Sequence, residues 1–302
     1  MATGASPSPA IRVVIPAQRA GALLARQLDA LVEQDNAPEF AVVVVLDLDD
    51  PGATLVASYQ DRLSITSVER PMRGAAAARN VGAASCTGAI LLFCDADDVV
   101  GPGWVRLMSV QVQQSGVAGS PMRVEWQLCP RWARPYYEEM DRSSLHLFYG
   151  VAPFVVSASL GIDRSLFEAA GGFDESFLGA GGEEVDLCIR LLQLSENGND
   201  DVRRSVEYGL VHDDSAIVRY RPRSTFRSIA RQRAGYSRGA ARVILKHQLT
   251  GIGTVASTDI DLLRSTLRSP RRIAVTAWSF LALRRGFRQG RKERVGINER
   301  GS

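Results

Sequence analysis

The chain has 302 residues, of which 45% are hydrophobic and 23% are charged, as in ordinary globular proteins that bury a sizeable core. It contains no apolar run of the roughly eighteen residues that a membrane-spanning helix needs. The N-terminal segment MATGASPSPA has neither the basic nor the apolar region of a secretory signal, so the sequence predicts a cytoplasmic protein whose residues 1–10 are disordered.

The net charge of +3 conceals an uneven distribution. Residues 1–218 carry 16 basic and 29 acidic side chains, whereas residues 219–302 carry 20 basic and 4 acidic side chains. A block this basic typically binds phosphate, in nucleic acid, anionic lipid or a pyrophosphate-bearing substrate, and the alternative is a solvated basic tail. The change in charge predicts one folded domain over residues 11–218 and a basic helical extension over residues 219–302.

Strand and helix patterns alternate through the first third of the chain. Short, mostly apolar runs predict strands, and leucines or alanines at helical spacing predict the helices between them. The predicted strands are residues 11–17, 40–47, 64–71 and 89–94, and the predicted helices are residues 21–34 and 74–85. The alternation predicts an open α/β sheet with right-handed crossovers, in which ligands bind at the carboxyl ends of the strands.

The turn after the first strand excludes two common phosphate-binding motifs. Its sequence, IPAQRAGALL, lacks the glycines of a dinucleotide-binding turn, and the chain has no Walker P-loop. A glycine-rich turn therefore does not wrap a phosphate here. Carboxylates after the second and fourth strands indicate a site for a sugar and a metal ion instead.

Three carboxylates, Asp95, Asp97 and Asp98, follow the fourth strand. Like charges this close raise one another's pKa and repel unless a cation or several hydrogen-bond donors offset them. Mg²⁺ and Mn²⁺ prefer carboxylate oxygens and keep positions open for substrate phosphates. The alternative makes Asp97 or Asp98 the N-cap of a helix that begins near Gly103 or Trp104.

Four segments in this order resemble the family-2 glycosyltransferases of the GT-A fold, over about residues 10–195. They are VVIPA, VVVVLD, RGAAAARNVGAASCTGAILLFCDADDVVGPGW and AGGFDESFLGAGGEEVDLCIRL. The resemblance implies an α/β GT-A fold, with an open, mixed, mostly parallel sheet flanked by helices. It also implies a hexosyltransferase that uses Mg²⁺ or Mn²⁺ and a nucleoside-diphosphate sugar (UDP, GDP or dTDP), with inversion. The alternative is a catalytically silent GT-A module that binds a sugar nucleotide or a protein partner.

The resemblance also implies roles for individual residues. Asp95-Ala96-Asp97 is the DxD-type motif, in which Asp97 is the metal ligand and Asp95 contacts ribose or sugar. Pro16, Ala17 and Asp47 line the nucleobase pocket, although LDLDDPGAT replaces the family's DDGSTDGT. The implied nucleotide-sugar-binding set is Pro16, Ala17, Asp47, Arg73, Arg79, Asp95, Ala96, Asp97, Arg231 and Gln232.

Arg79 and Asn80 follow Arg73 in the segment RGAAAARNVG. Arg79 either reaches a phosphate or pairs with the carboxylates at the strand ends, and the resemblance favours the phosphate. Asn80 is expected to hydrogen-bond the backbone at the sheet edge. In GGFDESF, Phe173 and Phe177 are expected to pack, and Asp174 to contact a hydroxyl.

A second acidic motif, GGEEVDLCIRL, opens a predicted helix. Glu183 and Glu184 in its first turn could simply favour the helix dipole, an effect of about 0.3–1 kcal/mol each. Sugar transfer with inversion, however, needs a carboxylate that takes a proton from the acceptor hydroxyl. Where family members have Glu-Asp-x-Asp, Glu184 takes the catalytic position, with Glu183 as second candidate. Asp186 and Arg190 are expected to pair at i, i+4.

The C-terminal segment offers arginines for phosphate and an apolar run for a surface. Arg231 and Gln232 resemble an Arg-Gln pair that the family places near the pyrophosphate, where arginine suits bidentate contacts. Residues 273–283 are apolar between arginine clusters, so they either lie on an anionic membrane surface or pack on the domain, which is favoured. A lone histidine, His212, is left out of the metal set, and no nucleic-acid partner is expected.

The expected acceptor is a glycan or a lipid-linked sugar of cell-envelope polysaccharide. An enzyme acting on such an acceptor is expected in the cytoplasm, possibly as a peripheral protein at the inner membrane face.

Overall fold

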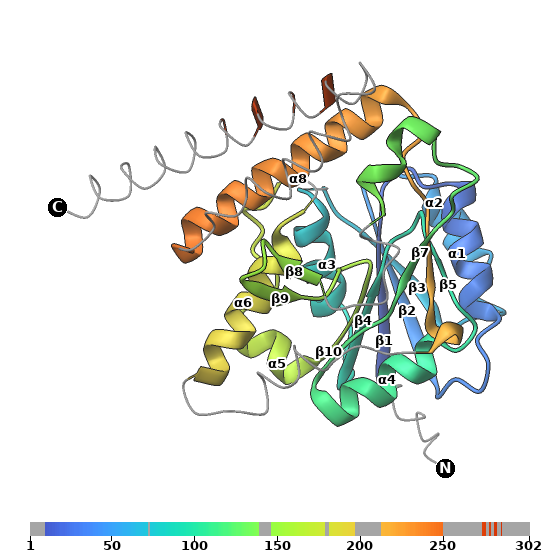
Figure 1. Cartoon of the computed structure of the whole chain (residues 1–302). Coiled ribbons are helices and arrows are strands. Elements are labelled where there is room, and N and C mark those ends of the chain that lie inside the picture. The colour runs from blue at the N-terminus through green and yellow to red at the C-terminus, as the bar shows by residue number, and fades with distance from the viewer. Residues whose placement is uncertain are drawn as a thin grey trace, which may run out of the picture.

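The structure, a computed structural model, describes residues 10–71, 73–138, 146–178, 181–196, 213–249 and, near the C-terminus, residues 274, 275, 278, 281, 282 and 285. His212 and Gly179 lie outside the described residues, as do residues 1–9, for which the sequence predicts disorder. Figure 1 shows a central sheet between two groups of helices, with one long helix at the end of the sheet.

The main sheet has six strands in the order β3-β2-β1-β4-β10-β6. Their bounds are β1 Ile11–Ala17, β2 Phe40–Leu46, β3 Ile65–Glu69, β4 Ile90–Cys94, β6 Val117–Gly119 and β10 Ser159–Asp163. The first four are parallel to one another, and β10 runs antiparallel to both β4 and β6. The four predicted strands and the mixed, mostly parallel sheet are confirmed.

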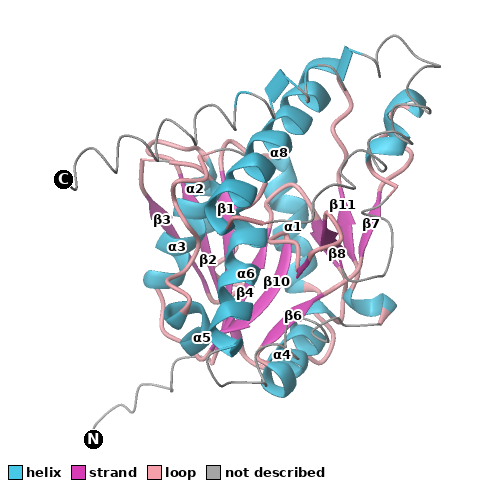
Figure 2. Ribbon diagram, turned by 60° about the vertical axis from the view of Figure 1, so that its left-hand side comes forward, coloured by secondary structure: helices cyan, strands magenta, loops and turns pink. Residues whose placement is uncertain are grey.

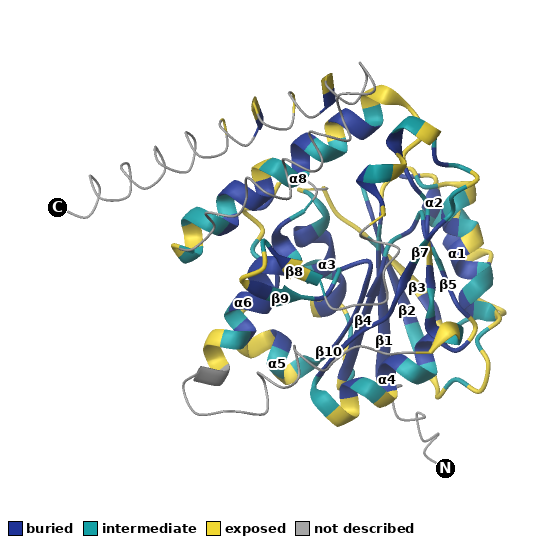
Figure 3. Cartoon of the chain, in the orientation of Figure 1, coloured by how far each residue is buried: buried dark blue, intermediate teal, exposed yellow. Residues whose placement is uncertain are grey.

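Helices cover both faces of this sheet because its strands are apolar at consecutive positions. On one face, Val13 and Ile15 of β1 belong to a core cluster with α1 (Ala22–Val32), α2 (Gly52–Ala57) and α4 (Trp104–Ser115). On the other face, Val14 joins a cluster with α3 (Ala75–Ala84), α5 (Arg164–Ala169) and α6 (Glu183–Glu196). Figure 3 shows the strands buried between these layers. The helices predicted at 21–34 and 74–85 are α1 and α3.

A second sheet lies beside the carboxyl end of β4. It has the order β5-β11-β7, with β5 Val99–Val100, β7 Met122–Val124 and β11 Val218–Tyr220. The described chain also contains two 3-10 helices, η1 Arg131–Tyr136 and η2 Asp214–Ala216. A separate hairpin pairs β8 His146–Phe148 with β9 Ala152–Phe154. The domain boundary predicted between residues 218 and 219 falls inside β11, so the change in charge does not mark the end of the folded domain.

The long basic helix α8, Phe226–His247, packs on this domain beside α6 (Figure 2). A capping box of Thr225 and Ser228 opens the helix, and Lys246 and His247 lie in its last turn, where cations favour the helix dipole. Among the described residues of the C-terminal segment, Val275 and Ala282 are buried, and Val275 shares a core cluster with Ile229 of α8. The interpretation of a terminal segment packed on the domain agrees with these two residues.

Within the described part of the chain, no helix is both long enough and apolar enough to cross a membrane.

Candidate active site

The predicted nucleobase pocket lies where β1 and β2 end side by side. Pro16 pairs in register with Val45, and Ala17 with Leu46, so Asp47 follows directly beside them. The Asp47 carboxylate accepts hydrogen bonds from Gln18 Nε2 at 3.2 Å and from the Leu48 amide at 3.0 Å. The structure therefore brings Pro16, Ala17 and Asp47 together, and their contact with a nucleobase stays a prediction.

Asp50, which the sequence did not single out as a site residue, joins the loops after β1 and β2. Its buried carboxylate accepts from the Arg19 amide at 2.6 Å and from the Gly52 amide at 2.9 Å. Two hydrogen bonds to backbone amides stabilise the ionised carboxylate and fix both loops. Asp50 therefore holds together the two loops that flank the expected base pocket.

The three aspartates after β4 lie close together, as their spacing predicts. Oxygen atoms of Asp95, Asp97 and Asp98 all lie within 4.8 Å of one another. Asp98 is buried, its Oδ1 accepts from the Arg221 amide at 2.9 Å, and its Oδ2 has no hydrogen-bond partner. Burial and the two neighbouring carboxylates raise the pKa of Asp98 well above its usual value. Within the described residues, the acidic cluster therefore contains one buried oxygen, Asp98 Oδ2, that no hydrogen-bond donor contacts.

These carboxylates fit a divalent cation. Hard cations take oxygen ligands, and a buried carboxylate oxygen without a partner is a ligand that the described residues leave unused. Asp98 thus joins Asp97 as a candidate ligand, although the sequence assigned only Asp97 to the metal. The N-cap interpretation is wrong, because α4 begins at Trp104 with Gly103 as N-cap and no side-chain cap.

Arg79 connects the two acidic motifs. From α3, its NH2 lies 2.7 Å from Asp95 Oδ1 and its NH1 lies 3.1 Å from Glu183 Oε1. The guanidinium and the Glu183 side chain are buried, so that ion pair is shielded from water, whereas the Asp95 side chain is 33% exposed. Of the two readings of Arg79, the structure shows pairing with the carboxylates, including one on α6 that the sequence did not connect to it. A contact between Arg79 and phosphate stays a prediction.

Glu183 and Glu184 open α6 after two glycines with left-handed φ angles, +90° at Gly181 and +99° at Gly182. Glu183 pairs with Arg79 through Oε1, and among the described residues the buried Oε2 atoms of both glutamates have no hydrogen-bond partner. Burial and the nearby Glu183 carboxylate raise the pKa of Glu184 to about 8. A carboxylate with a pKa near the operating pH suits general-base catalysis. The surroundings of Glu184 therefore match the role that the sequence motif implies.

The basic helix α8 contacts the turn in front of these glutamates. A Cβ atom on Gly239 would lie 1.9 Å from the Gly181 carbonyl oxygen, so only glycine permits this approach. The side chain of Gln232 is held between two tyrosines: Tyr137 donates to its Oε1 at 3.0 Å, and its Nε2 donates to Tyr220 at 2.9 Å. The glutamine of the predicted Arg-Gln pair thus has a side-chain amide that is already hydrogen-bonded.

The predicted arginines are more exposed than this glutamine. Arg73, just before α3, and Arg231, on α8, are both exposed. The neighbouring Arg233 was not selected from the sequence, yet its guanidinium stacks on Tyr136 at 5.4 Å and on Tyr236 at 5.9 Å. Binding of phosphate by Arg73, Arg231 or Gln232 stays a prediction.

A family model described as glycosyl transferase family 2 matches residues 12–170, more than half of the chain. The chain belongs to glycosyl transferase family 2. Validoxylamine A glucosyltransferase from Streptomyces hygroscopicus subsp. limoneus is 33% identical over 220 residues, which cover 61% of this chain and 48% of that protein. Pre-mycofactocin glycosyltransferase from Mycobacterium tuberculosis (strain CDC 1551 / Oshkosh) is 29% identical over 183 residues, covering 58% and 36%. The chain spans about half the length, or less, of these curated relatives.

Solved structures show the same fold as this family-2 chain. The mannosyltransferase PcManGT from Pyrobaculum calidifontis, in complex with GDP-Man and Mn²⁺, has a TM-score of 0.55 at 16% identity and covers 93% of this chain and 88% of its own. S. aureus TarS 1-349 in complex with UDP-GlcNAc has a TM-score of 0.51 at 13% identity, covering 95% and 92%. The expected GT-A fold and the family resemblance are confirmed.

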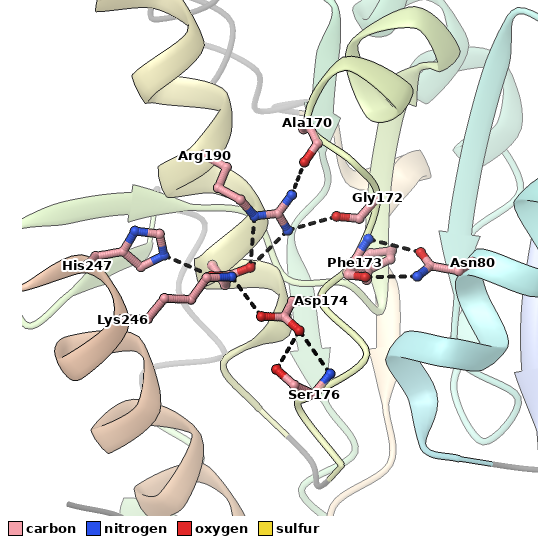
Figure 4. Close-up of polar contacts among 10 residues, drawn as sticks. Asn80, Ala170, Gly172, Phe173, Asp174, Ser176, Arg190, Lys246 and His247 are labelled. Carbon is pink, nitrogen blue, oxygen red and sulfur yellow. Dashed lines mark hydrogen bonds and ion pairs between the residues drawn. The ribbon is translucent and has the colours of Figure 1, made fainter. Parts of the chain in front are cut away.

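A buried ionic cluster fastens the far end of α8 to α6 in this family-2 fold (Figure 4). Asp186 of α6 has no exposed surface and contacts three cationic or ring groups: Arg190 NH2 at 2.8 Å, Lys246 Nζ at 2.7 Å and His247 Nε2 at 2.8 Å. Lys246 also reaches Asp174, at 2.7 Å. The pairing of Asp186 with Arg190 is confirmed, and the contacts to α8 are new.

The same cluster orders the loop before α6. Arg190 donates to the carbonyl oxygens of Ala170 and Gly172, and Asn80 hydrogen-bonds both the amide and the carbonyl of Phe173. Asn80 therefore bonds backbone, as expected. Phe173 is buried against Phe93 in a T-shaped contact, with ring centroids 5.4 Å apart. Residues 170–173, which lie ahead of α6 in the chain, are thus held by Asn80 of α3 and by Arg190 of α6.

Replacing Asp186 by asparagine should lower the free energy of unfolding by about 1–3 kcal/mol, because it removes the buried charge with which Arg190 and Lys246 pair. The ion partners lower the pKa of Asp186. Its contribution is therefore complete above the pKa of an unfolded aspartate, about 3.9, and is lost as the pH falls through the lower folded value. Urea unfolding at pH 7 and pH 3 measures this, with the exposed Asp61→Asn as control. Equal stability of D186N and D61N at pH 7 would contradict the stabilising role.

Proposed function

We propose that this chain transfers a hexose from a nucleoside-diphosphate sugar to an acceptor hydroxyl, with inversion and with a divalent cation. The single observation that carries the proposal is that Arg79 joins the DxD-type aspartate Asp95 to Glu183, next to Glu184. This link places a carboxylate cluster suited to a cation beside a carboxylate suited to proton transfer. Family membership and the GT-A fold support the same reaction.

The residues divide into a donor side and an acceptor side. Pro16, Ala17 and Asp47 would hold the nucleobase, and Asp95 would contact ribose or sugar. A divalent cation at Asp97 and Asp98 would offset the negative charge of the diphosphate leaving group. Glu184, ionised, would take the proton of the acceptor hydroxyl.

A panel of nucleoside diphosphates tests the donor side directly. We expect one of UDP, GDP or dTDP to bind more tightly in Mn²⁺ than in EDTA, and the matching sugar nucleotide to be hydrolysed slowly or transferred. Two structural neighbours hold different donors, UDP-GlcNAc in TarS and GDP-Man in PcManGT, so the panel also identifies the base that this chain binds. Tight nucleotide binding without hydrolysis or transfer of any sugar would favour the alternative, a catalytically silent sugar-nucleotide-binding module.

We further propose that the C-terminal segment holds this enzyme at an anionic membrane surface, near a glycan or lipid-linked acceptor of cell-envelope polysaccharide. Trp278 and Leu281 are 60% and 56% exposed, and the exposed Arg285 follows one turn later. Val275 and Ala282 are buried, so these described residues offer one face to the domain and another to the outside. An apolar face beside basic residues suits reversible attachment, at about 1 kcal/mol per basic residue near the surface.

Replacing Trp278 and Leu281 together by serine should reduce sedimentation with phosphatidylglycerol vesicles by about tenfold or more. The reason is that each of these apolar side chains contributes about 1.5–3 kcal/mol when the membrane buries it. Donor hydrolysis should stay unchanged, which separates the surface from the active site. The control replaces Leu48 and Val110, exposed apolar residues of the domain, by serine. Vesicle binding that is equal in wild type and in the W278S/L281S variant would contradict the proposal.

A further inference from the structure

Asp97, the predicted metal ligand, is paired with an arginine that the sequence did not assign to the site. Arg223 NH1 lies 2.8 Å from Asp97 Oδ2. The Arg223 side chain is 45% exposed and that of Asp97 is 26% exposed, so water reaches the pair. An ion pair this exposed contributes little stability, and another cation can replace its arginine at small cost.

The backbone that carries Arg223 is fixed, although its side chain is exposed. The Arg221 amide donates to Asp98 Oδ1 at 2.9 Å, and the Arg223 amide donates to the Tyr137 hydroxyl at 3.2 Å. Tyr137 in turn donates to Gln232 of α8. The connection between β11 and α8 is thus held at two points, at Asp98 of the acidic cluster and at Tyr137. The Arg223 guanidinium can therefore move over the cluster by side-chain rotation alone.

The charges around the cluster are unevenly matched. Asp95 and Glu183 share the buried Arg79, whereas within the described part of the chain the Asp98 carboxylate accepts only from the Arg221 amide. Arg223 is therefore the exposed cation of the cluster, at the carboxylate where a divalent cation is expected. A guanidinium and a divalent cation compete for this carboxylate, because two positive charges a few ångströms apart repel each other and each weakens the binding of the other.

We propose that Arg223 is a diphosphate-binding residue of the donor site that rests on Asp97 until a divalent cation takes that carboxylate. This inference rests on the proposed function. Once displaced, the guanidinium remains within a side chain's length of the cluster, because its backbone stays attached to Asp98 and Tyr137. Its planar donors suit a bidentate contact with phosphate oxygens, which lysine or a backbone amide cannot reproduce.

If Arg223 and a divalent cation exchange at Asp97, one variant should change the affinities for Mn²⁺ and for the nucleotide in opposite directions. In Arg223→Gln, Mn²⁺ alone should bind about two- to fivefold more tightly, because the competing guanidinium is gone. The Mn²⁺ complex of the nucleoside diphosphate that the wild type binds should bind about tenfold more weakly or worse, because a charge-assisted contact is lost. Arg227→Gln, an exposed arginine of the first turn of α8, removes the same charge and should change neither affinity beyond twofold.

Mn²⁺ binding is measured by electron paramagnetic resonance of the free ion, and nucleotide binding by calorimetry with UDP, GDP and dTDP at saturating Mn²⁺. Unchanged affinities in R223Q, or changes of the same sign for both ligands, overturn the exchange and leave Arg223 as a surface ion pair. Wild-type nucleotide binding that needs no Mn²⁺ but is lost in R223Q also overturns it, since Arg223 would then replace the metal. If the wild type binds none of the nucleotides, the proposed function fails, and the inference fails with it even when R223Q binds Mn²⁺ more tightly.

Discussion

Replacing Glu184 by glutamine should reduce turnover by about 10²-fold or more and leave the affinity for the donor unchanged. Glutamine keeps the size of the side chain but cannot accept the acceptor's proton, and general-base catalysis typically contributes about 10²–10⁴-fold. The measurement is transfer or donor hydrolysis at saturating sugar nucleotide, with donor affinity from calorimetry. Glu183→Gln is the matched comparison, because its carboxylate pairs with Arg79 instead. An active E184Q beside an inactive E183Q with full donor affinity would move the base to Glu183.

The pH dependence gives an independent readout of the same residue. The pKa of Glu184 is raised to about 8, so most of this carboxyl is protonated at pH 7 in the free protein. A general base works only when ionised, so kcat/KM should rise with pH, reach half its maximum near pH 8 and level off above it. Because the folded pKa lies above that of an unfolded glutamate, about 4.3, ionised Glu184 destabilises the fold as pH rises between these values. E184Q should therefore be no less stable than wild type at pH 8.

Replacing Asp97 by asparagine should abolish the part of nucleotide binding that depends on Mn²⁺. Amide oxygens carry no charge, and loss of even an outer partner of a metal ligand lowers metal affinity by about 10–100-fold, so loss of a direct ligand should lower it by at least about 100-fold. Calorimetry of the wild-type nucleotide, with and without Mn²⁺, measures the effect.

The fold should survive this change, since burial and the neighbouring Asp95 raise the pKa of Asp97, and removing its charge relieves that repulsion. Asp61→Asn, on an exposed loop position, serves as control for the change in net charge. Mn²⁺-dependent nucleotide affinity that is equal in D97N and wild type would remove Asp97 from the metal site and leave Asp98 as the candidate ligand.

Local sequence patterns determined the framework of this protein. Continuous apolar runs at Ile11–Ala17 and Phe40–Leu46 and the leucine spacing between them specify a parallel strand pair with its helix, because side-chain periodicity depends only on neighbouring residues. The same runs place Pro16, Asp47 and Asp95 at the carboxyl ends of strands. The position of the acidic cluster at one edge of the sheet could therefore be predicted without a structure.

Contacts between distant segments could not be predicted in this way. Arg79 meets Glu183 across 104 positions, and Asp98 accepts from Arg221 across 123 positions. For Arg79 the resemblance favoured a phosphate contact, and Asp98 was a candidate helix cap, because a residue type and its neighbours do not specify a partner on another element. The boundary drawn from charge failed at β11 for the same reason, since strand pairing depends on hydrogen bonds to β5 and β7 and not on net charge.

The amino-acid sequence by itself determined the GT-A framework, the two acidic motifs and their order along the chain. Only the tertiary structure decided that Arg79 pairs with both Asp95 and Glu183, and that Arg223 rests on Asp97. The physical reason is that ionisation and pairing depend on burial and on the nearest opposite charge, which are set when α3, α6 and the β11–α8 connection pack together around the end of β4.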